Sequence, residues 1–343
     1  MQAAIFDALN QPLRLVELDD PEPDRYQVLL KVCRCGICGS DLHITQDPVF
    51  GARAGDVLGH EFSGEVLEVG AEVTHLKVGD QVTAAPLFGC GDCDSCHRGE
   101  PAWCAQMRLT GGGYAQYATL AARQCRKLPS GISAADSALA EPLAVALHGV
   151  LQARMEPGDR VLVVGAGAIG LAVAYWARRL GAGSVVVTDL HRHQEQRALA
   201  LGATAFLTAE DDLARQARDR LGGDPDVVFE CVGKPGLIDQ CIGLVRPRGT
   251  VLVLGLCTTR DHFDAFRAIS KEVRITMSVF FSMREFEVAI DALDKGRHAP
   301  QALISETIAL ADLPTAFEAL RQRTSQCKVL VDPFRPAALP GVQ

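Results

Sequence analysis

Four cysteines fall within fifteen residues of one another, at Cys90, Cys93, Cys96 and Cys104. Their C-x2-C-x2-C-x7-C spacing predicts a closed zinc site, because four thiolates complete a tetrahedron and leave no position for substrate. An iron–sulfur cluster and four buried free thiols are the alternatives, and the cluster is disfavoured because Ala105, rather than a proline, follows the last cysteine. Such a metal is structural and stabilises a loop of low apolar content.

A second set of metal-ligating residue types is spread over three segments of the chain. Cys38 lies in CGICGSDLH, His60 and Glu61 lie in LGHEFSGEV, and Glu141 lies in AEPLAVALHG. A thiolate, an imidazole and a carboxylate form the ligand set of a catalytic zinc, which keeps one position open for water or substrate. A histidine after a glycine is by itself more often a packed or turn residue, so the prediction depends on the cysteine-rich segment. The residue types leave open whether Glu61 or Glu141 supplies the carboxylate.

A glycine-rich turn follows the apolar run at 161–164 and precedes a helical pattern. Its sequence, GAGAIG, places glycines at Gly165, Gly167 and Gly170. In a G-x-G-x-x-G turn the first glycine permits the tight turn, the second lets the backbone approach a pyrophosphate, and the third lets helix and strand pack closely. The amides at the start of the helix would bind the phosphates. The strand and helix on either side make this a strong prediction of dinucleotide binding.

The next apolar run, at 185–188, ends at Asp189. A carboxylate at this position accepts hydrogen bonds from the adenosine ribose and repels a 2′-phosphate. NAD is therefore favoured over NADP. Arg192 follows closely and is the residue type that accommodates a 2′-phosphate, so NADP remains the alternative.

The secondary structure expected around these residues changes at about residue 155. From about residue 155, strand and helix patterns alternate, which predicts a doubly wound six-stranded parallel sheet. The expected strands lie at 161–164, 185–188, 203–207, 227–231, 250–255 and 273–279.

Before residue 155, the stretch QVLLKVCRC at 27–35 alternates between apolar and polar residues like a half-buried strand. The alternation places Val28, Leu30 and Val32 on one face and Cys33 and Cys35 on the other.

Bulk properties limit the classes of function. A chain of 343 residues is expected to form two domains, and its net charge of −8 argues against nucleic acid or an anionic membrane as a partner. The first residues lack the pattern of a secretory signal, and no apolar run is long enough to span a bilayer. We therefore expect a cytoplasmic protein, in which the 12 cysteines serve metal binding, catalysis or packing rather than disulfides.

Taken together, CGICGSDLH, LGHEFSGEV, the four-cysteine segment, AEPLAVALHG, VVGAGAIG and VVVTDL resemble the zinc-dependent medium-chain dehydrogenase/reductase family, within the alcohol dehydrogenase superfamily. The resemblance extends over essentially the whole chain and is nearest the sorbitol, idonate and threonine dehydrogenases. It implies a GroES-like β-barrel catalytic domain at 1–150, with a structural-zinc lobe at 90–104. A Rossmann dinucleotide-binding domain follows at 151–285, and residues 286–343 return to the catalytic domain.

The resemblance also implies roles for individual residues. Cys38 and His60 hold the catalytic zinc, with Glu61 as a ligand or exchanging neighbour and Glu141 holding a zinc-bound water. Ser40 and His43 match the proton relay. The cofactor-lining positions are Ile169, Asp189, Leu254, Gly255, Leu256, Val279 and Phe280. Two zinc ions per chain and NAD are the expected cofactors, and a homo-oligomer, a tetramer or a dimer, is the expected assembly.

Two positions distinguish this chain from the polyol dehydrogenases that it resembles. Those enzymes usually carry a tyrosine after the relay histidine and an arginine before the last helix, where this chain has Ile44 and Phe281. The substitutions remove two partners for substrate hydroxyl groups. We therefore expect an apolar or sparsely hydroxylated secondary alcohol, or its ketone, as substrate. A polyol, a sugar acid or threonine is the alternative substrate, and an NAD(H)-binding redox sensor is the alternative without catalysis.

Overall fold

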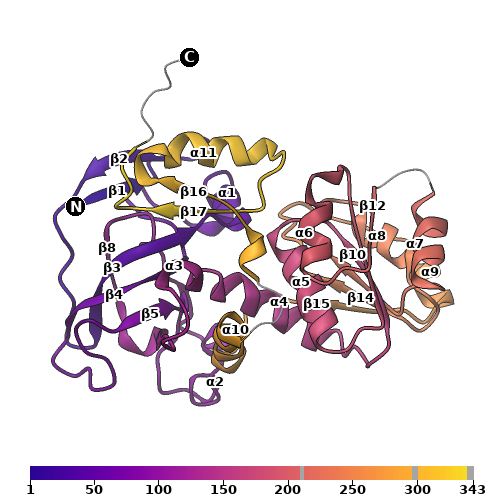
Figure 1. Ribbon diagram of the computed structural model, residues 1–343, viewed down its shortest axis with the longest axis horizontal. Helices are drawn as coiled ribbons and strands as arrows, with labels where there is room; N and C mark the ends of the chain where they lie inside the picture. Colours follow the sequence, from indigo (N-terminus) through magenta and orange to yellow (C-terminus); the bar gives the residue numbers. More distant parts are fainter. Residues whose placement is uncertain (209–211, 296–299, 338–343) are drawn as a thin grey trace. The chain divides into compact units, whose positions relative to one another are not determined.

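The computed structural model describes residues 1–208, 212–295 and 300–337, and its contacts divide them into two compact units. The first unit is built from 1–141, 282–295 and 304–337, and the second from 142–281 and 300–303. The first unit therefore contains segments from both ends of the chain (Figure 1). None of the helices in the described part is long and apolar enough to cross a bilayer.

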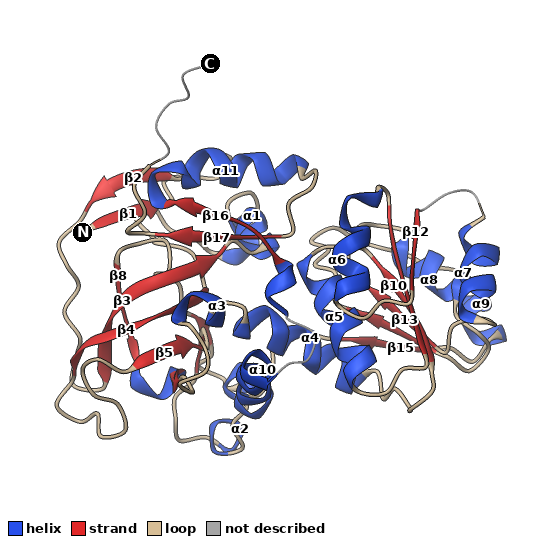
Figure 2. Ribbon diagram, viewed as in Figure 1, coloured by secondary structure: helices blue, strands red, loops and turns tan. Residues whose placement is uncertain are grey.

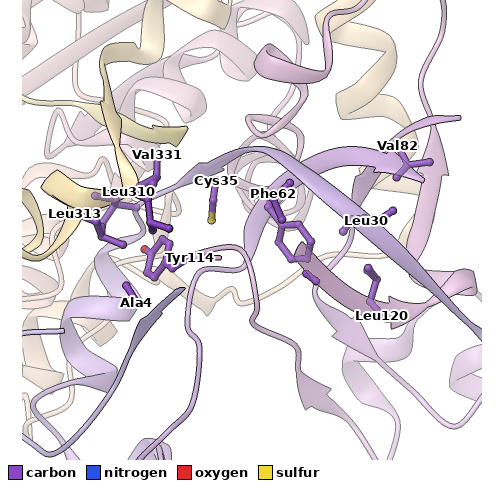
Figure 3. Close-up of a cluster of buried hydrophobic side chains, with 14 of the residues drawn as sticks. Ala4, Leu30, Cys35, Phe62, Val82, Tyr114, Leu120, Leu310, Leu313 and Val331 are labelled. Carbon is purple, nitrogen blue, oxygen red and sulfur yellow. The ribbon is translucent and has the colours of Figure 1, made fainter. Parts of the chain in front are cut away.

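The first unit is organised around a seven-stranded sheet of order β16-β17-β3-β4-β5-β9, with β8 paired to β3 (Figure 2). Its strands are β3 (Gln27–Gly36), β4 (Glu61–Val69), β5 (Gln81–Ala84), β8 (Tyr117–Ala121), β9 (Cys125–Lys127), β16 (Ile304–Ala309) and β17 (Lys328–Asp332). Two short antiparallel pairs accompany it: β1 (Gln2–Ile5) with β2 (Arg14–Glu17), and β6 (Leu87–Phe88) with β7 (Arg108–Leu109). The side chains of this sheet form one large core (Figure 3).

The face predicted for Cys35 is wrong. Val28, Leu30 and Val32 face the core as the alternation indicates, but Cys35 is also fully buried in that core. The pairing of β3 with β4 shifts register between Val32 and Arg34. An irregularity of this kind adds one residue to the strand and reverses the faces beyond it.

The described part of the first unit contains the α-helices α1 (Gly39–Ile44), α2 (Asp94–His97), α3 (Ala134–Ser137), α10 (Met283–Lys295) and α11 (Leu313–Ala319). The sequence of α10 favours a helix through a capping box at its start and an apolar stripe along one face. Ser282 and Glu285 form a capping box, with the Ser282 amide donating to the Glu285 carboxylate at 2.6 Å and the Glu285 amide to the Ser282 hydroxyl at 3.3 Å. Phe286, Ala289, Ile290 and Leu293 then form a buried stripe at helical spacing.

The second unit contains the predicted six-stranded parallel sheet, in the order β12-β11-β10-β13-β14-β15. Its strands are β10 (Arg160–Val164), β11 (Ser184–Asp189), β12 (Ala205–Thr208), β13 (Val227–Glu230), β14 (Thr250–Val253) and β15 (Arg274–Met277). The helices of this unit are α4 (Ala140–Gln152), which begins at the end of the first unit, α5 (Ala168–Arg179), α6 (Glu195–Ala200), α7 (Leu213–Leu221), α8 (Leu237–Leu244) and α9 (Ala265–Ser270). The sequence prediction of a doubly wound sheet is confirmed.

The inner strands of the second unit, β10, β11, β13 and β14, are buried on both faces, which explains why their sequences do not alternate. Leu162 and Val164 belong to a core cluster that includes side chains of α7 and α8, while Val161 and Val163, on the opposite face, are also completely buried. A parallel sheet covered by helices on both sides needs such continuous apolar strands. The carboxyl ends of these strands are the edge at which doubly wound sheets bind ligands.

Candidate functional site

The structure brings the four predicted cysteines of the loop together. The sulfur atoms of Cys90, Cys93, Cys96 and Cys104 all lie within 4.8 Å of one another. Cys93 caps the short helix α2, and Gly91 adopts a left-handed φ of +94° in the turn before it. All 12 cysteines of the chain are free thiols. The group is therefore a cluster of ligands rather than a pair of disulfides.

The geometry of this cluster fits a tetrahedral zinc ion. Two sulfurs on one such ion, each at ~2.3 Å, are about 3.8 Å apart, and the Cys90 and Cys96 sulfurs are 4.0 Å apart. Backbone amides of Cys90 and Gln106 each donate to the Cys104 sulfur at 3.3 Å. These donors lower the pKa of Cys104 to about 6, which favours the thiolate that binds metal. A zinc ion held by these four thiolates would have no open position for a substrate.

The second predicted set also converges, in the first unit. Ligand atoms of Cys38, His60 and Glu61 all lie within 4.8 Å of one another. Cys38 caps the start of α1, directly after β3, while Glu61 begins β4 and is paired with Gly36 of β3. The antiparallel pairing of β3 with β4 thus brings two segments distant in sequence to the same sheet end. A sulfur, a nitrogen and an oxygen donor are suited to a catalytic zinc.

Asp41, which the sequence analysis did not identify, lies against His60, the histidine predicted to bind metal. Its Oδ1 lies 3.2 Å from His60 Nδ1, and both side chains are almost completely buried. Since Nδ1 faces this carboxylate, Nε2 is the nitrogen left to bind a metal, and the Ser40 hydroxyl lies 3.4 Å from it. Burial raises the pKa of Asp41, but His60 and Tyr114 outweigh that effect and lower it, so Asp41 is a carboxylate.

Lys328 is a second residue that the sequence analysis did not identify. Its ammonium group donates to both Glu61 oxygens at 2.6 Å and to the Ile37 carbonyl at 3.0 Å, with both charged side chains buried. Strand β17 places it there by pairing with the end of β3. A side chain at Gly36 would collide with this ion pair, since a Cβ atom would lie 2.1 Å from Glu61 Oε2. Glu61 is therefore already held by a cation.

Glu141 lies outside the group of three ligands but within its electrostatic reach. The residue begins α4 and is 7% exposed. Burial raises its pKa to about 7, and the charges of His60 and Lys328 oppose that shift while Glu61 adds to it. Glu61 and Glu141 thus occupy different electrostatic environments. Glu61 is paired with the ammonium group of Lys328, whereas the pKa of Glu141 is governed mainly by its loss of hydration.

The predicted relay residues lie on α1. Ser40 donates from its hydroxyl to the Cys38 sulfur at 3.2 Å. His43 is partly buried three residues later, and burial together with the Arg321 charge lowers its pKa while Asp47 opposes them. Arg321 also donates to the Leu42 carbonyl at 3.0 Å. That contact fixes the end of the helix that carries Ser40 and His43.

The glycine turn of the second unit has the conformation that its sequence predicts. Gly165 has a φ of +101°, and Gly167 caps the start of α5. A Cβ atom at Gly170 would lie 1.9 Å from the Gly165 carbonyl oxygen, so only glycine permits this approach of helix and turn. The first amides of α5 are left free of intrahelical acceptors, as a phosphate-binding turn requires.

Asp189 lies at the end of β11 and is tied to this turn. Its Oδ2 accepts from the Ala166 amide and its Oδ1 from the Leu190 amide, each at 2.7 Å. Arg192 instead donates to the carboxylate of Glu195, at 2.8 and 2.9 Å. The negative charge of Asp189 therefore lies beside the turn, while the nearby guanidinium is already paired.

The remaining predicted cofactor positions belong to segments of the second unit that follow strand ends. Glu230, which the sequence analysis missed, closes β13, and its carboxylate accepts from the Val232 and Gly233 amides. A Cβ atom at Gly255 would lie 2.1 Å from the Gly233 nitrogen, so these two turns pack tightly. The other positions are Ile169 and Leu254, both partly buried, Leu256 and Val279, both exposed, and Phe280, whose φ is +60°.

The two positions predicted to shape the substrate pocket are both buried. Ile44 ends α1 in the first unit and is 9% exposed, while Phe281 closes the second unit's main segment and is completely buried. Neither side chain carries a group that can hydrogen-bond a hydroxyl.

Two family models match the chain. The alcohol dehydrogenase GroES-like domain matches residues 24–130, and the zinc-binding dehydrogenase model matches residues 168–295. Probable D-xylulose reductase A of Aspergillus clavatus is 33% identical over 320 residues, covering 89% of this chain and 88% of the relative.

Solved structures of two bacterial enzymes resemble the chain over nearly its full length. The 2R,3R-butanediol dehydrogenase of Bacillus subtilis has a TM-score of 0.86 and 30% identity, covering 97% of this chain and 99% of that one. The NADH complex of an Escherichia coli CFT073 alcohol dehydrogenase has a TM-score of 0.88 and 27% identity, also covering 97% and 99%.

Proposed function

The chain belongs to the zinc-dependent medium-chain dehydrogenase/reductase family, and on that premise we propose that it interconverts a sparsely hydroxylated secondary alcohol and its ketone. It is an oxidoreductase of CH–OH groups with zinc and NAD as its cofactors. The observation that carries the proposal is the convergence of Cys38, His60 and Glu61, which places a sulfur, a nitrogen and an oxygen donor within 4.8 Å of one another. A closed structural set needs no such mixture.

The residues around this group have separable tasks. Zinc bound by Cys38, His60 and a carboxylate would supply a Lewis acid for the alcohol oxygen, and NAD would supply the hydride acceptor. Asp41 holds the imidazole of His60 in one orientation. The Ser40 hydroxyl lies beside Cys38 and His60 and would take part in removing the proton of the alcohol. His43, three residues later on α1 and partly exposed, would release that proton to water. In the second unit, the turn at Gly165 binds the pyrophosphate of the dinucleotide.

The proposal of few substrate hydroxyls is supported by Ile44 and Phe281, which offer no hydrogen-bonding group. A buried hydroxyl left unpaired costs about 1–3 kcal/mol, and about 1.4 kcal/mol corresponds to a tenfold difference in affinity. The relative named as a butanediol dehydrogenase supports a short diol as substrate. The relative named as a D-xylulose reductase supports the alternative, a polyol.

A substrate panel tests the proposal. We expect kcat/KM for (R,R)-2,3-butanediol or cyclohexanol to exceed that for xylitol and sorbitol by about tenfold or more, as one unpaired hydroxyl group predicts. The measurement is the initial rate of NADH formation with zinc-loaded protein. A higher kcat/KM for either polyol than for both of the other alcohols would contradict the proposed substrate class.

Replacing Asp189 with serine is expected to reduce the preference for NAD over NADP by about tenfold or more. The carboxylate repels a 2′-phosphate, and the smaller neutral hydroxyl removes that repulsion together with a partner for the ribose. Because Asp189 also accepts from the Ala166 amide, KM for NAD should rise. Glu195→Gln is a useful companion, since it removes the negative charge that is paired with Arg192 and should increase NADP use without affecting Asp189. An unchanged ratio of kcat/KM values in the Asp189 variant would show that another residue sets the preference.

A further inference from the structure

We propose that Tyr114 is a positioning residue for the metal ligand His60 and that it acts through Asp41. This inference rests on the proposed function, because it gives Tyr114 a role at the same metal centre. Tyr114 lies in the segment between the four-cysteine loop and β8, more than fifty residues after His60. No local sequence pattern connects the two residues.

The first support is a chain of short polar contacts. The Tyr114 hydroxyl donates to Asp41 Oδ2 at 2.6 Å, and the other oxygen of that carboxylate lies 3.2 Å from His60 Nδ1. Oδ2 also accepts from the Cys38 amide, at the longer distance of 3.3 Å. One carboxylate therefore contacts the segments that carry Cys38 and His60, and its shortest contact is with the tyrosine.

The second support is the position of the tyrosine ring against Gly59, the residue before the histidine. Gly59 directly precedes His60 and has a φ of +81°. A Cβ atom at Gly59 would lie 2.5 Å from the Tyr114 ring and 2.8 Å from the Cys35 sulfur. The Tyr114 amide donates to the Leu58 carbonyl at 3.1 Å, which fixes the two segments side by side. The ring thus packs directly against the turn that presents His60.

The third support is the burial of the whole chain of contacts. Tyr114 and Asp41 are completely buried and His60 is 4% exposed. The tyrosine lies in the core of the first unit, near Ala4, Leu310 and Leu313 (Figure 3). A buried carboxylate needs hydrogen-bond donors, and water cannot readily replace a missing one here. Burial, and next the charge of Asp41, raise the pKa of the Tyr114 hydroxyl, so it remains a donor at neutral pH.

Removing the hydroxyl therefore has a defined consequence. In Tyr114→Phe the ring stays against Gly59, but Asp41 loses its shortest contact. The carboxylate is then free to rotate, and the imidazole orientation that depends on it is less well fixed. Changes to residues that orient metal ligands typically weaken metal binding by about 10–100-fold. A residue needed only for packing would keep its role as phenylalanine.

The experiment measures zinc release without substrate. Fully loaded protein is mixed with a chromophoric chelator, and release from the two sites is followed as two phases. In Tyr114→Phe we expect the catalytic-site phase to be about tenfold faster and the four-cysteine phase to be unchanged. Tyr117→Phe, on the neighbouring strand β8, is the matched control, and its release should equal that of the unmodified protein.

A double-mutant cycle tests whether the effect passes through Asp41. Asp41→Asn keeps the shape of the side chain but places an amide beside His60. If Tyr114 acts through Asp41, adding Tyr114→Phe to Asp41→Asn should change the release rate by less than about twofold. Independent effects that multiply would overturn the inference and assign Tyr114 a packing role. The cycle also gives a second way to test the inference if one variant folds poorly.

The outcomes separate this inference from the proposed function. An active enzyme whose catalytic-site zinc leaves at the same rate in Tyr114→Phe would overturn only the role of Tyr114. Acceleration of both release phases would also overturn it, because that result indicates general destabilisation. Unmodified protein that holds one zinc per chain and oxidises no alcohol would instead refute the proposed function, and with it the role of Tyr114.

Discussion

Replacing Cys38 with serine should abolish alcohol oxidation while leaving about one zinc ion per chain. Serine keeps the size of the side chain but replaces a thiolate, a strong zinc ligand, with a neutral hydroxyl. The four-cysteine loop shares no ligand with this site, so its zinc should remain. Loss of a Lewis acid worth several kcal/mol predicts a fall in kcat of about a thousandfold or more. Metal analysis and the rate of NADH formation on the same sample measure both effects.

Cys33→Ser is the matched control for this experiment. Cys33 lies on β3, five residues before Cys38, and it is outside the group of ligands. That variant should keep two zinc ions per chain and the activity of the unmodified protein. Turnover that survives in Cys38→Ser with a single zinc would show that the group of Cys38, His60 and Glu61 is not the catalytic site. Unmodified protein that binds NAD but oxidises no alcohol would instead favour a non-catalytic NAD(H)-binding role.

The four-cysteine site could be predicted because all of its information is local. Four ligands within one loop have a spacing that can be read directly, and the turns between them determine where the sulfurs point. The glycine turn is equally local. Gly165 and Gly170 are required by contacts within one strand, turn and helix, and the alternating elements around it predict the parallel sheet. Short-range geometry was sufficient in both cases.

The environment of the second site could not be predicted in the same way. Glu61 and Lys328 are 267 residues apart, and Lys328 begins the apolar stretch KVLVD, which is typical of a buried strand rather than of a functional site. Asp41 and Tyr114 likewise meet only after the sheet has formed. The burial of Cys35 was also not predictable from the local sequence. The register shift that turns its side chain into the core arises from the pairing of β3 with β4. Contacts that are set by strand pairing leave no local pattern in the sequence.

Replacing Lys328 with methionine is expected to lower the free energy of unfolding by about 3–5 kcal/mol, as is typical when one partner of a buried ion pair is removed. The side chains of Lys328 and Glu61 are 4% and 1% exposed, so the remaining carboxylate cannot regain its hydration. Methionine retains most of the aliphatic volume, which limits the loss of packing. The measurement is the urea midpoint of zinc-loaded protein in a Trp176→Phe background, in which the remaining tryptophan, Trp103, lies in the first unit and its fluorescence reports the unfolding of that unit.

Lys127→Met provides the matched control, because the Lys127 to Asp80 pair has the same 2.6 Å separation but a lysine side chain that is 56% exposed. Solvent screens that pair, so its loss should cost less than about 1 kcal/mol. The double variant Glu61→Gln/Lys328→Met removes both charges, and it should recover much of the stability lost in Lys328→Met. Equal losses in the two lysine variants, or a double variant less stable than Lys328→Met, would mean that the charge of Glu61 is not what Lys328 neutralises. Recovery in the double variant would instead establish that this ammonium is needed because the charge of Glu61 is buried beside Cys38 and His60.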